Sequence, residues 1–512
     1  MKSYKFKKIK LSDNTLYDDL KAYVREMPDK DFLFTEDASR TLEETFQRVR
    51  FLMCLFSGKG IKKGDIAAIR MSRTPEALLL FFALQSLGAL TVLCDSHSTV
   101  NDFIESAEIN ISPLWFITDE EGGWALKDKT FNDVCALDLW ADTAFSEAEA
   151  DALAAKVDVR DGAVIIFTSG STGKIKAVIQ SQFAYLNATR ISREGFACDN
   201  GGAFLVVVPL YHMVFLTAAL GTALVLKQSM VFPKHTSAEY VMESIERFKI
   251  TTLVAAPTLY LNMTQSDSRK RYDLSSMVCG HTSAGPYTSE QFKQIEKVLG
   301  FRISGSYGTT EFCAVTITAG IAPIEVRSRG VGCVYPNIEC FILDGDGKNV
   351  PAGEEGEICA RGFPLMKGYY GDKEATREVI DENGIFHTGD IGRFDKDGIL
   401  YITGRIKNLI IRGGKNISPE KIETALLSLS YIHQAAAVGI KDEIYGEVPA
   451  VMAILKPGEK ADEKQIKRDL ESKLIKPEMP VKIVVVERLP LLSAGKVDKA
   501  KIKNILSLWP TA

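Results

Sequence analysis

Apolar and polar positions alternate along the first two thirds of the chain in a pattern that predicts helices and strands in turn. Apolar residues recur at helical spacing over residues 42–56, and Gly58 and Gly60 follow as a stop signal. Short apolar runs typical of strands lie between such segments. The expected strands are residues 66–70, 89–94, 163–167, 204–208 and 252–255, and the expected helices include one from Ala77 and one over residues 242–248. This alternation favours a doubly wound α/β layer with parallel strands.

The pattern changes after about residue 330, where short strands are bounded by turn signals. Residues 338–343 precede an Asp-Gly-Asp-Gly turn, and residues 399–402 follow an Asp-Lys-Asp-Gly turn. Past Gly404 the predicted helices are rich in Lys and Glu, as in residues 419–427 and 463–474. We therefore expect an α/β protein with a large N-terminal domain of doubly wound sheets plus a β-rich subdomain, and a small α+β C-terminal domain. The expected boundaries are 1–404 and 405–512.

Composition excludes several classes of partner and compartment. The chain has 512 residues, with 62 basic and 66 acidic side chains and a net charge of −4, so it offers no basic field for nucleic acid or anionic lipid. Nine cysteines without a CxxC pair argue against a disulfide framework and a structural zinc site, and favour a reducing cytoplasm. The most apolar run, residues 77–93, is interrupted by Gln85, Ser86 and Gly88, so we expect a buried helix and strand rather than a membrane span.

A glycine- and hydroxyl-rich loop follows the predicted strand at residues 163–167. Glycine lets backbone approach a ligand, and successive N–H groups can converge on one anion, so the loop is suited to phosphate. The P-loop of nucleotide triphosphatases is a poor match, because only Ser171 and Thr172 separate its glycines and Ile175 stands where a hydroxyl is needed. A plain surface loop is the alternative if the loop is considered alone. The loop comprises Thr168, Ser169, Gly170, Ser171, Thr172, Gly173, Lys174 and Lys176.

Four further stretches follow in order. They contain Ser306, Tyr307, Gly308, Thr309, Thr310 and Glu311; Thr388, Gly389 and Asp390; Arg405, Lys407, Gly413 and Gly414; and Gly495 with Lys496. Together with the glycine-rich loop, in this order and spacing, they resemble the adenylate-forming superfamily of acyl-CoA synthetases, peptide-synthetase adenylation domains and beetle luciferases. The resemblance covers nearly the whole chain. It implies that a carboxylate attacks the α-phosphate of ATP and that pyrophosphate leaves.

The resemblance also implies a role for each of these residues. The loop would bind the β- and γ-phosphates, Glu311 would hold Mg²⁺, and Thr310 would contact the α-phosphate. Tyr307 would stack on adenine, and Asp390 would bind the ribose hydroxyls with Arg405 nearby. The edge of the adenine would meet Ser283, Ala284 and Gly285. Considered alone, Glu311 and Asp390 would be ordinary turn or helix-start carboxylates.

The C-terminal domain is expected to be mobile on the same grounds. Lys496 would bridge the carboxylate and the α-phosphate, although a lone lysine is nearly always a surface charge. The domain would then rotate about Lys407 and bring the face bearing Gly413 and Gly414 towards the acyl-adenylate. The chain departs from the superfamily pattern at Ile175 and Ala177, where its loop commonly has Pro and Gly, which puts the shape of the loop in doubt.

The acid substrate is expected to be apolar. His212 stands where amino-acid adenylation domains carry an Asp, which argues against α-amino acids as substrates; a packed histidine is an equal alternative to a pocket-lining one. We therefore predict an AMP-forming acid:CoA ligase, using ATP, Mg²⁺ and coenzyme A, for an aliphatic or aromatic acid. The alternatives are an acyl-AMP ligase that loads a carrier protein and a catalytically inactive nucleotide-binding relative. The residues expected to line the acyl pocket are Tyr211, Met213, Val214, Phe215, Phe312 and Val315.

Overall fold

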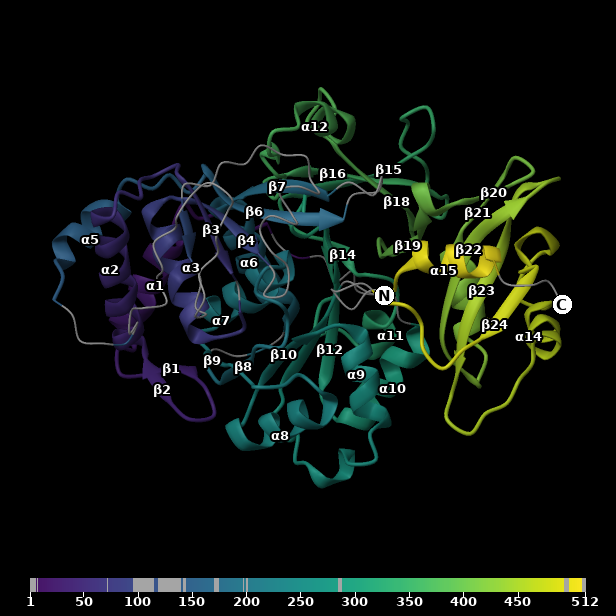
Figure 1. Cartoon of the computed structure of the whole chain (residues 1–512), viewed down its shortest axis with the longest axis horizontal. Coiled ribbons are helices and arrows are strands. Elements are labelled where there is room, and N and C mark those ends of the chain that lie inside the picture. Colours follow the sequence, from purple (N-terminus) through teal and green to yellow (C-terminus); the bar gives the residue numbers. More distant parts are fainter. Residues whose placement is uncertain are drawn as a thin grey trace. The chain divides into compact units, whose positions relative to one another are not determined.

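The chain forms two compact units. The computed structural model describes residues 6, 8–70, 72–94, 115–117, 140, 144–169, 175–196, 198, 201–283, 288–491 and 497–508. Unit 1 consists of Met1–Cys340 and Ala360–His387, and unit 2 of Phe341–Cys359 and Thr388–Ala512. Both units combine helices and strands, as Figure 1 shows.

The first sheet of unit 1 has nine strands in the order β14-β13-β12-β11-β10-β8-β9-β1-β2. From β1 to β12 the neighbours are parallel, and the flanking β2, β13 and β14 are antiparallel. The strands are β1 Asp31–Phe34, β2 Ser39–Thr41, β8 Ala203–Leu205, β9 Ser229–Val231, β10 Thr252–Ala255, β11 Cys279–Thr282, β12 Arg302–Tyr307, β13 Thr316–Ile317 and β14 Cys333–Val334.

The second sheet of unit 1 has six strands in the order β17-β7-β6-β4-β3-β5. β6, β4, β3 and β5 are parallel, whereas β7 is antiparallel to both β6 and β17. The strands are β3 Ile66–Arg70, β4 Leu90–Cys94, β5 Trp115–Ile117, β6 Gly162–Ser169, β7 Ile175–Ser181 and β17 Gly368–Tyr369.

The helices of unit 1 supply most of its apolar core. In α3 every residue but Glu76 is buried, and Gly88, at φ 73°, ends the helix in the left-handed conformation that glycine adopts without strain. α2 begins at a capping box between Thr41 and Glu44. The helices are α1 Leu16–Glu26, α2 Leu42–Gly58, α3 Pro75–Leu87, α5 Glu147–Ala154, α6 Gln182–Phe196, the π-helix η1 Phe215–Leu220, α7 Gly221–Val225, α8 Ala238–Phe248, α9 Pro257–Gln265, the 3₁₀ helix η2 Arg269–Arg271, α10 Ser289–Leu299, α11 Ile324–Arg327 and α12 Lys373–Val379.

A four-stranded sheet in the order β15-β16-β18-β19 contains the points where the chain passes between the units. Its strands are β15 Ile338–Leu343, β16 Gly356–Gly362, β18 Phe386–Phe394 and β19 Leu400–Arg405. The paired residues of β18 and β19, 390–394 and 400–405, belong to unit 2 and are antiparallel.

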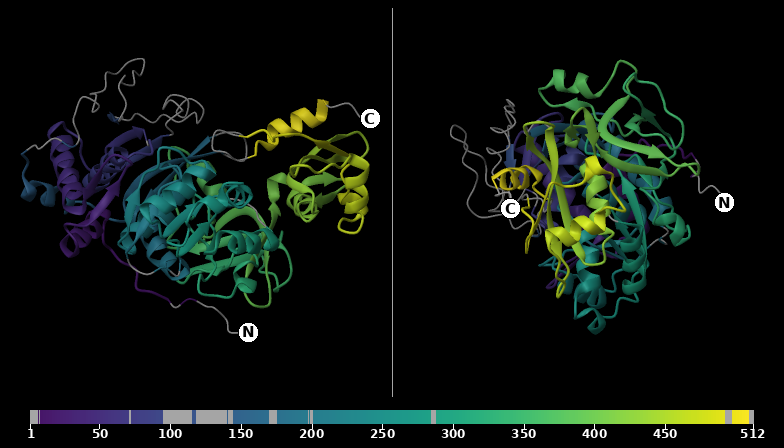
Figure 2. Two further views of the ribbon diagram at one scale, coloured as in Figure 1. Left: turned by 90° about the horizontal axis from the view of Figure 1, so that it is seen from below. Right: turned by 90° about the vertical axis from the view of Figure 1, so that its right-hand side faces the viewer.

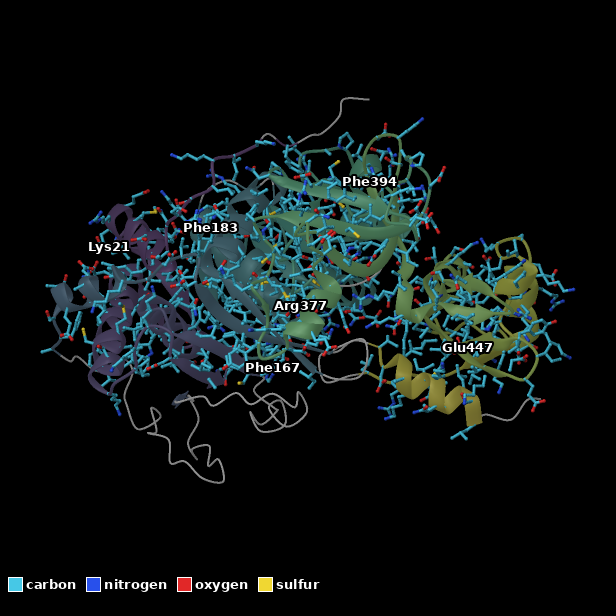
Figure 3. The ribbon with its side chains drawn as sticks, turned by 90° about the horizontal axis from the view of Figure 1, so that it is seen from above. Lys21, Phe167, Phe183, Arg377, Phe394 and Glu447 are labelled. Carbon is cyan, nitrogen blue, oxygen red and sulfur yellow. A yellow bond between two sulfur atoms is a disulfide. The ribbon has the colours of Figure 1, made fainter. Side chains whose placement is uncertain are left out.

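Unit 2 also contains a five-stranded sheet, in which β21, β20, β23 and β22 are neighbours in that order and β24 pairs with β23. The strands are β20 Ile410–Arg412, β21 Lys415–Ile417, β22 Ile432–Asp442, β23 Gly446–Leu455 and β24 Lys482–Val485. The helices are the 3₁₀ helices η3 Ile406–Asn408 and η4 Lys476–Glu478, with α13 Pro419–Leu427, α14 Glu463–Leu470 and α15 Lys499–Leu508. α15 lies along the sheet, where Lys503 donates to Glu447, which Figure 3 labels, at 2.8 Å; Figure 2 shows this helix in yellow.

The predicted fold class is confirmed, and most predicted elements are present within a few residues. Two were predicted too long. β8 ends at Leu205 rather than residue 208, because its pairing with β10 stops there. α14 ends at Leu470 rather than residue 474; residues 471–473 form turns, and the Glu471 N–H donates to the Arg468 carbonyl only three residues back. Among the helices of the described ranges, none has the length and apolar character needed to cross a membrane.

One pair of cysteines in the described ranges is bonded. Cys198, just after α6, is bonded to Cys279 at the start of β11, with a Cα–Cα distance of 6.4 Å. The two residues are 81 positions apart, so only the packing of α6 against the sheet brings them together. The sequence argued against a disulfide framework, and this single bonded pair weakens the cysteine argument for a reducing compartment.

Candidate active site

The glycine-rich loop lies between the end of β6 and the start of β7, two antiparallel strands that form a hairpin. The pairing of β6 with β7 extends to Ser169 opposite Ile175, and Thr168 lies opposite Lys176. Phe167, labelled in Figure 3, directly precedes Thr168 on β6. Thr168 and Lys176 therefore lie where the loop begins and ends. Gly170, Ser171, Thr172, Gly173 and Lys174 lie outside the described residues.

Tyr369 joins the lysine at this end to the predicted metal ligand. The Lys176 ammonium lies 4.6 Å from the centre of the Tyr369 ring, a cation–π distance. The Tyr369 hydroxyl donates to Glu311 Oε1 at 3.0 Å. Burial, together with the Glu311 carboxylate, raises the pKa of Tyr369 well above its usual value, so the phenol remains a donor at neutral pH. One side chain thus links a cation and a carboxylate that the sequence assigned to phosphate and to magnesium.

Gln180 of β7 holds the backbone beneath Glu311. Its side chain is fully buried, and its amide nitrogen donates to the carbonyl oxygens of Thr310 and Glu311, both at 3.1 Å. The backbone N–H of Met366 donates to the same Glu311 carbonyl at 2.8 Å. The Glu311 side chain therefore extends from a fixed backbone, which is what a ligand-binding group requires.

Neither Gln180 nor Tyr369 was predicted. Gln180 is the second-last residue of an ordinary apolar strand, and nothing local distinguishes Tyr369 from Tyr370. The pairing of β17 with β7, which places Tyr369 opposite Val178, is the signal that identifies it, and this pairing joins residues far apart in the chain.

The predicted nucleotide residues of unit 1 gather at the carboxyl ends of β11 and β12. Thr282 lies opposite Gly305 in this parallel pair, so Ser283 and Ser306 follow side by side. Tyr307 ends β12 and is 8% exposed. Ligands of open α/β sheets bind at this edge, beyond the carboxyl ends of the strands. Ala284 and Gly285 lie outside the described residues.

The turn after Tyr307 is shaped by close backbone approach. A Cβ on Gly308 would lie 2.4 Å from the carbonyl oxygen of Cys313, a distance that no side chain tolerates. Thr309 Oγ1 accepts from the backbone N–H of Phe312 at 3.1 Å and closes the turn. Thr310 and Glu311 lie between these two contacts, so the turn fixes their direction.

His212 lies just before the π-helix η1, in the segment predicted to line the acyl pocket. Its ring is half-buried and tilted against Tyr211, with centroids 4.6 Å apart. Phe312 is fully buried and stacks on Phe386. The predicted pocket residues Met213, Phe215, Phe312 and Val315 are buried, whereas Tyr211 and Val214 are half-buried.

Unit 2 brings Asp390 and Arg405 together. They lie directly opposite each other on β18 and β19, and Arg405 Nε donates to Asp390 Oδ1. The carboxylate is nearly buried, with 7% of its side chain exposed, whereas 41% of Arg405 is exposed. The Asp390 backbone N–H donates to Thr388 Oγ1 at 3.0 Å. The guanidinium therefore orients the carboxylate that was predicted to bind ribose.

The predicted hinge and the thioester face also belong to unit 2. Lys407 is exposed in the 3₁₀ helix η3. Gly413 and Gly414 form the turn between β20 and β21, both with positive φ, at 54° and 78°. Lys496 lies outside the described residues, on the segment between Leu491 and Val497, which pair with each other.

Family models cover most of the chain. The model described as AMP-binding enzyme matches residues 20–370, and the model described as AMP-binding enzyme C-terminal domain matches residues 421–496. The chain belongs to the AMP-binding enzyme family. The resemblance to the adenylate-forming superfamily is thereby confirmed, and with it the prediction that the chain is an enzyme.

The curated relatives of this AMP-binding enzyme include several CoA ligases. It is 29% identical to a 4-coumarate–CoA ligase of Humulus lupulus, over 86% of this chain and 84% of the relative. It is 29% identical to a mitochondrial medium-chain acyl-CoA ligase of Danio rerio, with 96% and 88% covered. A 2-succinylbenzoate–CoA ligase of Bacillus cereus is 28% identical, with 94% and 96% covered.

Solved structures share the fold of this AMP-binding enzyme. An anthranilate CoA ligase in complex with anthranoyl-AMP aligns with a TM-score of 0.82 at 20% identity, covering 98% of each chain. The o-succinylbenzoate CoA synthetase of Bacillus subtilis, with its acyl-adenylate intermediate, aligns at 0.79 and 24% identity, covering 98% of this chain and 100% of the other.

Proposed function

We propose that this protein is an acid:CoA ligase that activates an apolar carboxylic acid with ATP and transfers the acyl group to coenzyme A. The observation that carries the proposal is that Lys176 and Glu311 both contact one phenol, Tyr369, at the loop end of the β6–β7 hairpin. A cation and a carboxylate held side by side suit a polyphosphate with a hard metal ion. The CoA ligases among the relatives support the general activity.

The phosphate step would depend on the hairpin. A carboxylate and an α-phosphate are both anionic. Catalysis of the attack therefore requires that the two groups are positioned and that positive charge is placed where negative charge develops. Lys176 would supply charge at the end of the loop, and the loop residues 170–174 would supply backbone donors to the β- and γ-phosphates. Thr310, beside Glu311, would contact the α-phosphate.

Glu311 fits a magnesium ligand. Its Oε1 accepts from Tyr369 and its backbone is fixed by Gln180, which leaves the carboxylate oriented and partly accessible. Carboxylate oxygen is the ligand that Mg²⁺ prefers, and the ion keeps its remaining positions for water and phosphate oxygens. When bound, Mg²⁺ would neutralise charge on the leaving pyrophosphate.

Each unit contains residues that we assign to the adenosine. Ser283 and Tyr307, at the carboxyl ends of β11 and β12, would bind adenine together with residues 284–285. Asp390, oriented by Arg405, would accept hydrogen bonds from the ribose hydroxyls. Gly308 and Thr309 would shape the turn around the nucleotide.

The second half-reaction would use unit 2 differently. Lys496 would act in adenylation, and rotation about Lys407 would then exchange it for the face at Gly413 and Gly414, to which coenzyme A would bind. His212 and the apolar residues around it favour an aliphatic or aromatic acid.

Exchange of labelled pyrophosphate into ATP tests the adenylation step. We expect exchange with at least one acid from a panel of aliphatic and aromatic acids. Lys176→Ala should lower it by about 10²–10³, as expected when a group that stabilises transition-state charge is removed. Lys293→Ala, on an exposed position of α10, is the matched control and should leave the rate unchanged.

A chain without exchange on any acid would be an inactive nucleotide-binding relative, which would contradict the proposal. An equal loss of exchange activity in Lys176→Ala and Lys293→Ala would show that Lys176 does not belong to the site.

A further inference from the structure

An ion network joins two helices of unit 2, α13 and α15. The Lys499 ammonium, on the first residue of α15, lies 2.9 Å from Glu423 Oε1 and 3.3 Å from Glu420 Oε1. Only 10% of the Glu423 side chain and 31% of the Lys499 side chain are exposed. Burial disfavours the charge of the ammonium, but the two carboxylates hold the pKa of Lys499 above its usual value. The lysine is therefore charged at neutral pH.

The two helices cover opposite faces of the five-stranded sheet. Leu426 of α13 packs in one apolar cluster with Ala437 of β22. Leu506 of α15 packs in another cluster with Ala436, the preceding residue of β22. Neighbouring side chains of a strand point to opposite faces, so the helices lie on the two sides of β22. β22 ends the strand order, and at its edge Glu423 Oε1 accepts from the Ala437 N–H at 2.8 Å. The network therefore fixes the start of α15 against α13 around this edge.

The segment that carries Lys496 leads directly into the network. The backbone N–H of Asp498 donates to the Pro490 carbonyl at 2.9 Å, so the chain that leaves the segment is bound to the chain that enters it. Lys499 is the next residue, three positions after Lys496. Because Lys499 is held against α13, both flanks of the segment are held there as well.

The network also reaches the predicted hinge. Asn408, the last residue of the 3₁₀ helix η3, donates from Nδ2 to Glu420 Oε1 at 3.4 Å, the same oxygen that accepts from Lys499. Asn408 directly follows Lys407, about which the C-terminal domain is predicted to rotate. Glu420 thus connects the hinge with the start of α15. A lysine that a rotation brings to the reaction needs such a link, because its final position depends on a rigid connection to the hinge.

We propose that Lys499, held by Glu423 and Glu420, is a positioning residue for Lys496. Its role belongs to adenylation, the step in which Lys496 would bridge the carboxylate and the α-phosphate. The inference rests on the proposed function and adds a group to its first half-reaction. A misplacement of about 1 Å can lower a rate by about 10²-fold, so loosening the start of α15 is enough to impair the step.

A purely structural role of the network predicts a different result. Removing one partner of a buried ion pair leaves an uncompensated charge and destabilises the fold. Damage of that kind would lower both half-reactions, because both are assigned residues of unit 2. A positioning role lowers adenylation and spares thioester formation from supplied acyl-adenylate.

The test measures both half-reactions in Lys499→Met, which keeps an apolar stem and removes the charge. We expect the kcat of pyrophosphate exchange to fall by about 10- to 100-fold with the KM for ATP unchanged, because Lys496 would act mainly in the transition state. Thioester formation from supplied acyl-adenylate and CoA should be largely spared. Lys499→Arg, which can still bridge two carboxylates, should restore most of the exchange rate.

Two further variants separate positioning from general damage. Lys503→Ala removes an ion pair that α15 makes with Glu447 of β23, and as the matched control it should leave exchange at the wild-type rate. Glu420→Gln weakens the network at its more exposed carboxylate and should cause a smaller loss of the same kind. This second variant decides the question if Lys499→Met does not fold.

An equal loss of both half-reactions in the Lys499 and Glu420 variants would overturn the inference, and so would unchanged exchange in Lys499→Met. A loss of exchange in Lys503→Ala as large as in Lys499→Met would overturn it too. In each of these cases wild-type exchange leaves the ligase proposal intact. Absence of exchange with every acid in the wild type would instead refute the ligase proposal, and this inference with it.

Discussion

Tyr369 shows how one residue can connect two parts of a binding site. Its ring contacts Lys176 and its hydroxyl donates to Glu311, so the position of both charged groups depends on it. Removing the hydroxyl would leave the ring contact in place and free only the carboxylate. The phenol therefore acts through Glu311.

We expect Tyr369→Phe to weaken the apparent affinity for Mg²⁺ by about tenfold, because a hydrogen bond to a charged group contributes roughly 1.5–3 kcal/mol and part of it is regained from water. Mg²⁺ titration of pyrophosphate exchange and calorimetry of Mg·ATP binding would both measure it. Tyr370→Phe, on the neighbouring tyrosine, is the control. Identical Mg²⁺ curves for the wild type and Tyr369→Phe would show that the phenol does not position the metal ligand.

Single residues were predictable from sequence where a motif identified them. Glu311, Asp390 and Arg405 each lie in a recognisable stretch, and the structure places Asp390 and Arg405 opposite each other. Gln180 and Tyr369 escaped prediction because their importance depends on which strands are neighbours. The sequence gives no sign that His281 contacts Ser304 and Ser306, because only the pairing of β11 with β12 makes these residues neighbours.

The observed bounds of strands and helices match the predicted bounds where local pattern and packing favour the same element. α13 and β10 match their predicted bounds, because apolar spacing, Pro419 at the start of the helix and β-branched residues all favour the observed element. β8 and α14 were predicted too long: the strand stops where its pairing with β10 stops, and the helix passes into turns at residues 471–473, and the apolar pattern shows neither change. The Cys198–Cys279 bond depends on packing between elements in the same way.

His281 of β11, which is buried between Ser304 and Ser306 of β12, makes stability depend on pH. The pKa of His281 falls from 6.5 to about 3 in the folded protein, so between these values the unfolded chain binds one proton more. Stability from the neutral ring is complete above pH 6.5 and is lost as pH falls towards 3. The slope contributed by one such proton is about 1.4 kcal/mol per pH unit.

We expect the unfolding free energy of His281→Gln to fall less steeply than that of the wild type between pH 6.5 and pH 4.5, by up to about this slope. Urea unfolding at three pH values would measure the difference. His235→Gln, on an exposed side chain, should keep the wild-type slope. Parallel pH profiles for the wild type and His281→Gln would show that His281 is already charged in the folded protein.

At the scale of the whole molecule, the proposed residues divide between two compact units. Glu311, Lys176 and Tyr307 belong to unit 1, and Asp390 and Lys407 to unit 2. A reaction with two half-steps can use this division, if one unit presents different faces to the other in turn. The candidate site residues of both units were named from the sequence. The domain boundary at 404/405 and the rotation of the C-terminal domain remain predictions.

Lys496→Ala separates the two steps. We expect adenylate formation to fall by about 10²–10³, because the ammonium would stabilise charge that develops only in the transition state. Thioester formation from supplied acyl-adenylate and CoA should be largely spared. Lys501→Ala, on an exposed position of α15, is the matched control. An equal loss in both half-reactions would contradict the exchange of faces.

Release of AMP from ATP, measured across a panel of acids with and without CoA, tests the central claim most directly. The account predicts that at least one acid yields AMP and an equal amount of its CoA thioester, and that this product forms only when CoA is present. An acyl-adenylate that CoA cannot discharge would contradict the account, because the acceptor would then be a carrier protein or another nucleophile.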